Sequence, residues 1–385
     1  MELSIRYRLF DLVKYFLKLG AIGFGGPVAL VAHMHRDLVE QRNWISEEEY
    51  KEGLSLAQLA PGPLAAQLAI YIGFIHFGLI GATLVGFAFI MPSFLMVLAL
   101  GYLYVVYDGI GWIQAVFYGV GATVMAIIAV SAYKLSIKSL GKNKIYWIIA
   151  FLLAINTFIT EKESSWLLLA AGGLSWWLSK KRGHTQVLNG IQTLFLFWQQ
   201  TVQVQENEKL TTIGLFFLKA GAFVFGSGLA IVPFLYGSVV NEYHWLNDQQ
   251  FLDAVAVAMI TPGPVVITVG FIGYLTAGWM GAVVASLATF LPCYLFTVLP
   301  APYFKKYGKK AGIKEFVEGV TAGAIGAIIG AVVVLGKRQF TDFPSIVLAL
   351  LVLIILIRFK KIPEPVLILL GAGVGLVLKL LFPDL

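Results

Sequence analysis

The sequence predicts an all-α, polytopic membrane protein made of two homologous repeats that are inverted in the bilayer. Of its 385 residues, 59% are hydrophobic and 13% are charged, whereas a soluble domain is about 45–50% apolar and about 25% charged. Apolar runs long enough to cross a bilayer recur along the chain, and they lack the alternation of a membrane barrel. The net charge of +7 is therefore attributed to cytoplasmic loops and not to a nucleic-acid surface.

An internal duplication is the second observation. The stretch FLKLGAIGFGGPVAL at 16–30 returns as FLKAGAFVFGSGLAI at 217–231, and more than half of its positions are identical. Trp44 and Trp245 pair at the same spacing. A period this long indicates a duplicated domain and not a solenoid of short repeats.

We expect an N-terminal repeat over 1–182, a linker over 183–208 and a C-terminal repeat over 209–385. Each repeat contains six apolar segments, some of which carry glycine and proline breaks. In the first repeat the segments are 9–31, 53–78, 80–104, 110–134, 145–160 and 164–179. In the second they are 212–235, 254–276, 279–301, 313–335, 343–358 and 363–382.

A helix start precedes the second segment of each repeat. Ser46 can cap the helix that follows, and Glu49 can reach back to close a capping box. Asn247 and Gln250 occupy the matching places in the second repeat. The two repeats thus keep the same helix start although the residues differ.

Lys and Arg in the connecting loops indicate that the repeats are inverted, because these residues favour the cytoplasmic side. In the first repeat they gather in 134–144 and 179–183, and in the second they gather in 303–314 and 358–364. The first two loops follow even-numbered segments, and the last two follow odd-numbered segments. Inverted repeats are a recurring architecture of secondary transporters, with the substrate site near the midplane.

One pair of matching loops opposes this assignment. The loop 33–52 carries three positive residues and would lie outside, whereas 237–253 carries none and would lie inside. Inversion also requires an extra crossing, which the uncharged residues 185–205 could supply; an interfacial helix is the alternative. We expect thirteen spans in the inner (plasma) membrane, with the N-terminus in the cytoplasm and the C-terminus outside.

Two breaks rich in glycine and proline interrupt each repeat. In Pro-Gly-Pro the first proline ends a helix, the glycine turns the chain, and the second proline suits the start of a half-helix. Such a start presents free N–H groups and a positive dipole end, which favour an anion; kinks and close-packing glycines are the alternative. The break residues are Gly23, Phe24, Gly25, Gly26, Pro27, Pro61, Gly62 and Pro63 in the first repeat and Phe225, Gly226, Ser227, Gly228, Pro262, Gly263 and Pro264 in the second.

Lys18 and Lys219 are matched charges within apolar segments, and a charge in such a place is a candidate functional residue. They could neutralise an anion near the breaks, or they could extend to the membrane interface. Gln58 could donate to an oxyanion, although Met259 stands at its place in the second repeat. No carboxylate within the segments identifies itself as a proton carrier.

Sequence motifs of other protein classes are missing. The chain has no phosphate-binding GxxxxGK[ST] motif and no cluster of His, Cys and carboxylates at metal-ligand spacing. We therefore expect no ATP-driven pump, no enzyme, no cofactor and no metal site. A secondary transporter for a small anion fits best; an anion channel and an enzyme acting on lipid are the alternatives.

The motifs GFGGP at 23–27, Trp44 and PGP at 61–63, together with their counterparts in the second repeat, resemble those of the chromate ion transporter family. The resemblance covers nearly the whole chain. It implies a secondary transporter that exports chromate from the cytoplasm and confers chromate resistance, with the break residues in the substrate site. Sulfate has the same shape and charge as chromate, so transport or exchange of sulfate or another oxyanion is the alternative. Coupling to protons or to a counter-anion, and assembly into a homo-oligomer, are compatible with it.

Overall fold

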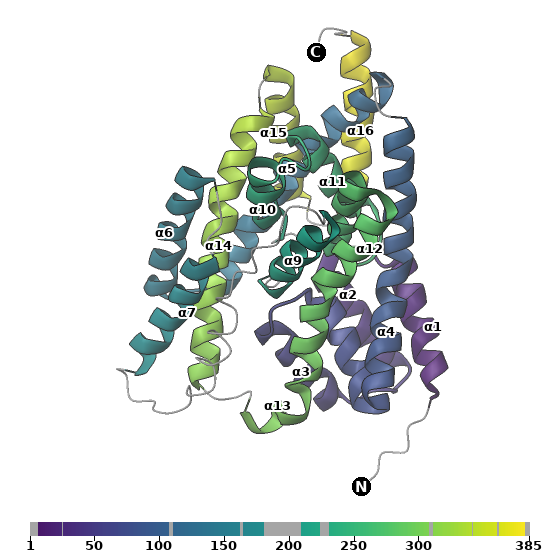
Figure 1. Ribbon diagram of the computed structural model, residues 1–385, viewed down its shortest axis with the longest axis vertical. Coiled ribbons are helices and arrows are strands. Elements are labelled where there is room, and N and C mark those ends of the chain that lie inside the picture. Colours follow the sequence, from purple (N-terminus) through teal and green to yellow (C-terminus); the bar gives the residue numbers. More distant parts are fainter. Residues whose placement is uncertain are drawn as a thin grey trace.

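Every regular element in the described part of the chain is a helix (Figure 1). The computed structural model describes residues 7–24, 26–107, 111–161, 165–180, 209–223, 231–307, 311–340, 342–359 and 362–381. Within these residues, five helices are long and apolar enough to cross a membrane, and three shorter apolar helices accompany them. The predicted all-α, polytopic fold is confirmed.

The helices of the two repeats correspond in order. The first repeat contains α1 (Leu9–Ile22), α2 (Gly26–Met34), the π-helix η1 (His35–Gln41), α3 (Glu47–Leu59), α4 (Leu64–Val106), α5 (Gly111–Leu140), α6 (Lys144–Thr160) and α7 (Ser165–Lys180). The second contains α9 (Lys209–Ala222), α10 (Ile231–Tyr236), the π-helix η3 (Gly237–Glu242), α11 (Asp248–Ile260), the 3-10 turn η4 (Val265–Ile267), α12 (Thr268–Val298), α13 (Ala301–Tyr307), α14 (Ala311–Gln339), α15 (Phe343–Arg358) and α16 (Glu364–Leu381).

Both predicted helix starts are confirmed. The Glu49 amide donates to Ser46 Oγ at 3.2 Å, and the Ser46 amide donates to Glu49 Oε2 at 2.9 Å. The backbone N–H of Gln250 donates to Asn247 Oδ1 at 2.8 Å, and the backbone N–H of Asn247 donates to Gln250 Oε1 at 3.1 Å. These capping boxes fix the residues at which α3 and α11 begin.

The first apolar segment of the first repeat is a helical hairpin and not a span. The chain reverses at the break after α1, so α2 and η1 run back along α1. Tyr15 near the middle of α1 donates to Asp37 Oδ2 of η1 at 3.4 Å. Tyr7 stacks on Trp44 with ring centroids 4.5 Å apart. Both ends of the hairpin therefore lie at one face of the protein, which we call the N face.

The second apolar segment is also a hairpin, formed by α3 and the first part of α4. A Cβ atom added to Gly53 of α3 would overlap the Tyr71 ring of α4, so the two helices run side by side in opposite directions. His76 lies at the end of this part of α4, and its Nδ1 forms a hydrogen bond with the Tyr7 hydroxyl at 2.8 Å. This hairpin also opens at the N face.

A sharp turn then separates the two parts of α4. Phe77 and Gly78 have non-helical backbone angles, and Gly73 packs directly against Gly81 on the other side of the turn. The remainder of α4, from residue 79, crosses the body to the opposite face, which we call the C face. In α12 the same turn occurs at Ala277 and Gly278.

The second repeat enters from the C face. Phe216 of α9 packs on Trp245 at 5.5 Å between ring centroids, as expected for a hairpin like that of α1. Glu161, at the C-face end of α6, pairs with Arg338, which also contacts Asp248 at the start of α11 at 3.3 Å. The hairpins of the two repeats thus open at opposite faces, and the repeats are inverted.

The prediction of thirteen spans is corrected by this arrangement. The segments 9–31, 53–78, 212–235 and 254–276 return to the face from which they entered, since their half-helices are antiparallel. Among the described residues, the segments that run from one face to the other are the second parts of α4 and α12 and the helices α5, α6, α7, α14, α15 and α16, of which α6, α7 and α15 are shorter than the helices long enough to cross a membrane.

The hairpins also explain the loops that disagreed with the charge rule. The loop 33–52, with its three positive residues, lies at the N face beside the other loops rich in Lys and Arg. The loop 237–253, which contains no Lys or Arg, lies at the C face. Residues 185–205, the predicted extra crossing, lie outside the described residues. The helices that flank them end at the N face (α7) and begin at the C face (α9).

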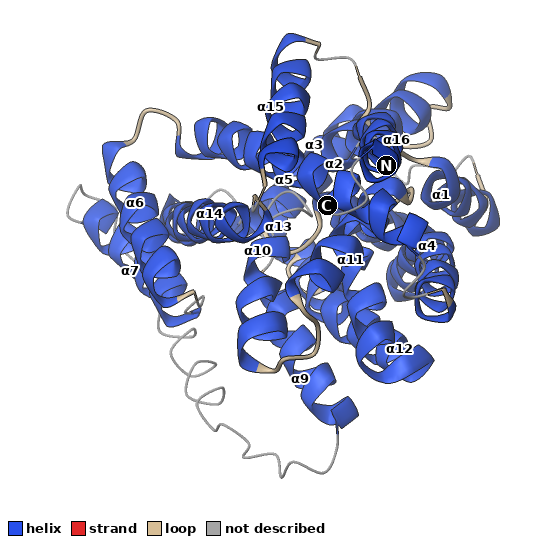
Figure 2. Cartoon of the chain, turned by 90° about the horizontal axis from the view of Figure 1, so that it is seen from above, coloured by secondary structure: helices blue, strands red, loops and turns tan. Residues whose placement is uncertain are grey.

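The two repeats exchange their last helices. Helices α15 and α16 of the second repeat pack on α5 of the first, while α6 and α7 pack on α14 (Figure 2). Small residues allow these approaches: a Cβ atom on Gly119 of α5 would overlap the Gly371 carbonyl of α16, and one on Gly326 of α14 would overlap the Ala150 carbonyl of α6. The long helices α5 and α14 are therefore each covered by the last two helices of the other repeat.

Candidate functional site

The described hairpin tips of the two repeats meet inside the protein. The Gly263 amide, in the second Pro-Gly-Pro, donates to the Gly23 carbonyl at 2.9 Å. Ser93 Oγ, in the crossing part of α4, donates to the Pro262 carbonyl at 2.7 Å. These bonds join segments that belong to different repeats, so the two breaks form one structure.

The first Pro-Gly-Pro packs in an equivalent way. Gln67 Nε2 donates to the Pro61 carbonyl at 2.9 Å. A Cβ atom on Gly62 would lie 2.7 Å from the Gln67 amide and 3.2 Å from Cys293 Sγ in α12. Cys293 follows Pro292 as Ser93 follows Pro92. Each Pro-Gly-Pro turn therefore rests on the proline-containing crossing helix of the other repeat.

The predicted chain reversal at the central glycine is confirmed at both turns. Gly62 has a φ of +145° and Gly263 a φ of +95°, values that glycine adopts without steric cost. The incoming helices end just before the turns, at Leu59 and Ile260. Pro63 and Pro264 then occupy the N-cap positions of α4 and η4.

A narrow cleft separates the tips. It has room for about one water molecule, so a tetrahedral oxyanion can enter only when the tips move apart. Its walls come from the starts of α2, α4 and η4, which belong to both repeats. The lining residues are Pro27, Leu30, Pro63, Ala65, Gly263, Pro264 and Val265.

The electrostatic character of the cleft comes from the backbone. The lining side chains are uncharged, while α2, α4 and the η4–α12 unit begin at its edge. The first N–H groups of a helix have no partner within the helix, and its N-terminal dipole end carries about half a positive charge. Three such starts converge, which suits a small anion. No cluster of His, Cys, Asp or Glu that could hold a metal occurs among the described residues.

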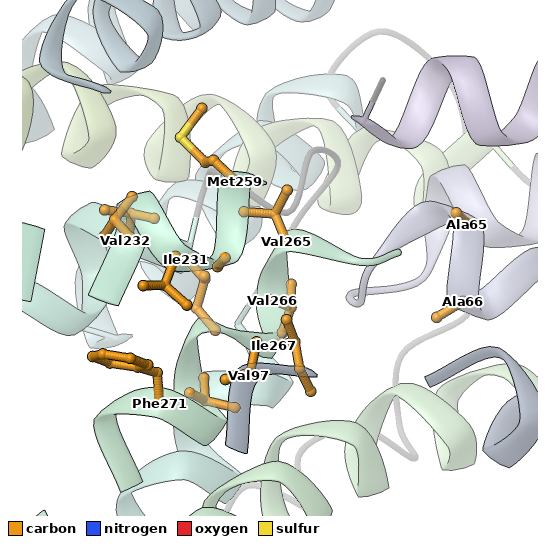
Figure 3. Packing of buried hydrophobic residues seen from close by; sticks show 14 of the residues in the cluster. Ala65, Ala66, Val97, Ile231, Val232, Met259, Val265, Val266, Ile267 and Phe271 are labelled. Atoms are coloured by element: carbon orange, nitrogen blue, oxygen red, sulfur yellow. The ribbon is translucent and has the colours of Figure 1, made fainter. Parts of the chain in front are cut away.

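A tightly packed apolar layer supports the second-repeat turn. Val266, Ile267 and Phe271 are completely buried, and they pack with Val97 from the crossing part of α4 (Figure 3). Ala65 and Ala66 mark the start of α4 in the same view. Because this layer contains residues of both repeats, the second-repeat turn is packed directly against the first repeat.

Several residues predicted for the site do not line the cleft. Lys18 on α1, Lys219 on α9 and Gln58 on α3 are exposed, and Phe24 is 43% exposed. A role for these side chains at the anion stays a prediction of the sequence, and the exposure of both lysines favours its alternative, that they extend to the membrane interface. Residues Gly25, Phe225, Gly226, Ser227 and Gly228 lie outside the described residues.

Sequence reasoning missed three side chains that hold the turns. Ser93 and Cys293 stand at matching places after the paired prolines, and this pairing is the signal that could have identified them. Gln67 is fully buried, and its Oε1 has no hydrogen-bond partner within the described structure. The second repeat has no glutamine at the equivalent place, so the duplication offers no signal for this residue.

Comparison with known proteins gives a consistent result. The sequence matches the family described as chromate transporter over residues 10–176 and 211–376, once in each repeat. It is 61% identical to the chromate transport protein of Cupriavidus metallidurans over 378 residues, which cover 96% of this chain and 93% of that protein. It is 56% identical to a probable chromate transport protein of Synechococcus elongatus, with 96% of each chain covered. A chromate transport protein of Pseudomonas aeruginosa is 30% identical over 75% of this chain and 72% of that protein. No solved structure matches.

Proposed function

This chain belongs to the chromate transporter family, and we propose that it is a secondary transporter that exports chromate from the cytoplasm across the inner membrane and so confers chromate resistance. The relatives named as chromate transport proteins support the substrate. The observation that carries the mechanism is the convergence of three helix starts from two inverted repeats on one cleft.

Chromate is a tetrahedral dianion that can accept hydrogen bonds at all four oxygens. In our proposal the free N–H groups at the starts of α2, α4 and η4 bind these oxygens directly. The converging helix dipoles supply positive potential without a buried lysine or arginine.

Alternating access follows from the inverted hairpins. The hairpins of the first repeat open at the N face, and those of the second open at the C face. Separation of the tips toward one face exposes the cleft to that face while the opposite hairpins keep it closed. Inverted repeats move in this manner in other secondary transporters.

The direction of transport follows from the membrane potential. The Lys- and Arg-rich loops lie at the N face, which we therefore place in the cytoplasm. The start of α1 is then inside and the end of α16 outside, and these two points lie at opposite ends of the structure (Figure 1). Export of a dianion from a negative interior is favourable by about 2.3 kcal/mol per charge per 100 mV, which doubles for two charges.

Uptake of chromate into everted membrane vesicles tests this proposal. Ala65 lines the cleft and is 2% exposed, so Ala65→Leu should fill the cleft and abolish uptake. Ala21→Leu is the matched control, because Ala21 is exposed on α1, and it should transport as the wild type does. Absence of chromate uptake by the wild-type protein, or equal uptake by both variants, would contradict the proposal.

Sulfate is the second candidate substrate, and the backbone character of the site favours it. N–H donors recognise shape and charge, which chromate and sulfate share. We expect sulfate to compete with chromate in the same vesicles. If the wild type accumulates sulfate and ignores chromate, the site stands and its substrate is a different oxyanion.

A further inference from the structure

The re-entrant helix α11 carries a buried carboxylate. Asp253 is 2% exposed and lies five residues after Asp248, the first residue of α11. At 1.5 Å per residue this places it about 7.5 Å along the helix from the C face, on the way to the tip. An ionisable side chain at such a depth is costly to maintain, and it is therefore a candidate functional residue.

Two of the side chains that hold this carboxylate are uncharged. Tyr104 donates its hydroxyl to Asp253 Oδ2 at 2.8 Å, and Gln249 donates its amide to Oδ1 at 2.8 Å. Tyr104 lies in the crossing part of α4 and packs edge-on against Phe271 of α12. The bond from Tyr104 to Asp253 therefore connects a crossing helix of the first repeat to a hairpin of the second.

Other titratable groups lie on α11 and on the elements that pack near it. The Tyr118 hydroxyl of α5 donates a hydrogen bond to Asp342 Oδ1. Asp248 is paired with Arg338. Among the described residues, titratable side chains near this end of the elements packed against α11 also include Tyr102 and Tyr107 on α4, Tyr274 on α12, Glu242 on η3 and Lys379 on α16.

The first repeat has a carboxylate at the matching position. Glu52 of α3 occupies the place of Asp253, and it interacts with Tyr71. Phe271 stands where Tyr71 stands, and Phe304 stands where Tyr104 stands. Each repeat therefore has one carboxylate that interacts with a tyrosine, but both tyrosines belong to α4 of the first repeat, Tyr71 in its first part and Tyr104 in its crossing part. Because the repeats are inverted, the two carboxylates flank the central cleft from opposite faces.

We propose that Asp253 binds the proton that this transporter exchanges for the anion, an inference that rests on the proposed function. A hydronium ion at the C face transfers its proton to Asp253 Oδ2 and leaves as water. The neutral acid no longer accepts the charge-assisted bond from Tyr104, so the connection between α4 and α11 weakens. The hairpin can then move, and the proton travels inward as the anion travels outward.

Purified protein in proteoliposomes tests this assignment. Two readings are taken from each variant: chromate exchange without a pH gradient, and proton movement reported by a trapped pH-sensitive dye. Asp253→Asn should retain exchange and lose chromate-dependent proton movement, because the amide keeps the size of the side chain and cannot carry the proton. Asp253→Glu should retain both.

Tyr104→Phe gives an independent reading. The bond from Tyr104 stabilises the ionised carboxylate, so its removal favours protonation. The pH midpoint of proton-coupled transport should therefore shift upward, whereas a purely structural tyrosine would lower the rate without moving the midpoint.

The outcomes separate the two proposals. If the wild type does not exchange chromate, the proposed function fails and this inference fails with it. If the wild type exchanges chromate without moving protons, or if Asp253→Asn still moves them, only the proton site is wrong. Loss of exchange in both Asp253→Asn and Asp253→Glu would assign the carboxylate a structural role and overturn the inference.

Discussion

Substitution of Gly263 by alanine probes the contact between the two repeats. Gly263 lies in the second Pro-Gly-Pro, its amide donates to the Gly23 carbonyl, and its φ is +95°. A Cβ atom at this position would overlap Ser93 Oγ. The substitution therefore strains the backbone and displaces the hydroxyl that donates to the Pro262 carbonyl.

The size of the effect follows from these two contributions. A side chain at positive φ costs about 1–2 kcal/mol. Loss of the bond from Ser93 costs about 1 kcal/mol. We expect Gly263→Ala to lose about 2–3 kcal/mol of unfolding free energy, the sum of these two contributions, and to lose transport as well, because the cleft wall moves.

A double-mutant cycle measured by thermal unfolding in detergent checks this reasoning. Ser93→Ala removes the hydroxyl, and the new Cβ would then meet Ser93 Cβ at 3.1 Å, a tight but tolerable distance. The double variant should lose less stability than the sum of the single variants. Gly278→Ala is the control for backbone strain alone, since Gly278 has a φ of +62° and open space around it. Additive losses, or a Gly263→Ala variant as stable as Gly278→Ala, would refute the packing argument.

Three further sets of variants test other parts of the structure. Lys18→Ala and Lys219→Ala should transport at the wild-type rate, because both lysines are exposed away from the cleft; loss of uptake in everted vesicles would return them to the site. Gly119→Leu should prevent folding, since any side chain there overlaps α16, whereas Gly173→Leu on α7 should fold normally because nothing lies within 4 Å; size-exclusion chromatography of the purified variants distinguishes these results. Arg338→Gln should destabilise the protein by about 1 kcal/mol or less, because its ion pairs are partly exposed; a larger loss of thermal stability would mean that these pairs lock the C face.

The local features of the breaks could be predicted from the sequence because they depend on short-range chemistry. The capping boxes at Ser46 and Asn247 need only residues three positions apart. The reversals at Gly62 and Gly263 follow from the conformational limits of proline and glycine. Because the sequence is duplicated, each of these predictions rests on two matching segments.

The re-entrant hairpins could not be predicted from apolar length. Residues 9–31 are long enough to cross a bilayer, and their reversal depends on contacts such as Tyr7 with Trp44, which are distant in sequence. The charged loop 33–52 was the available signal. Its disagreement with the charge rule arose because two hairpins, and not two spans, precede the first crossing.

The burial of individual side chains could not be predicted from the sequence either. Lys18 is conspicuous in the sequence but faces outward, whereas Asp253 is inconspicuous and lies between the repeats. The exchange of the last helices between the repeats decides which face of each long helix is covered. That exchange leaves no local pattern in the sequence.

Equilibrium dialysis of radiolabelled chromate against the purified protein tests the central claim most directly. Because the tips of both repeats build one cleft, we predict one bound anion per chain. Binding should disappear in Ala65→Leu and persist in Ala21→Leu. Two anions per chain, or unchanged binding in Ala65→Leu, would mean that the repeats do not share a single central site.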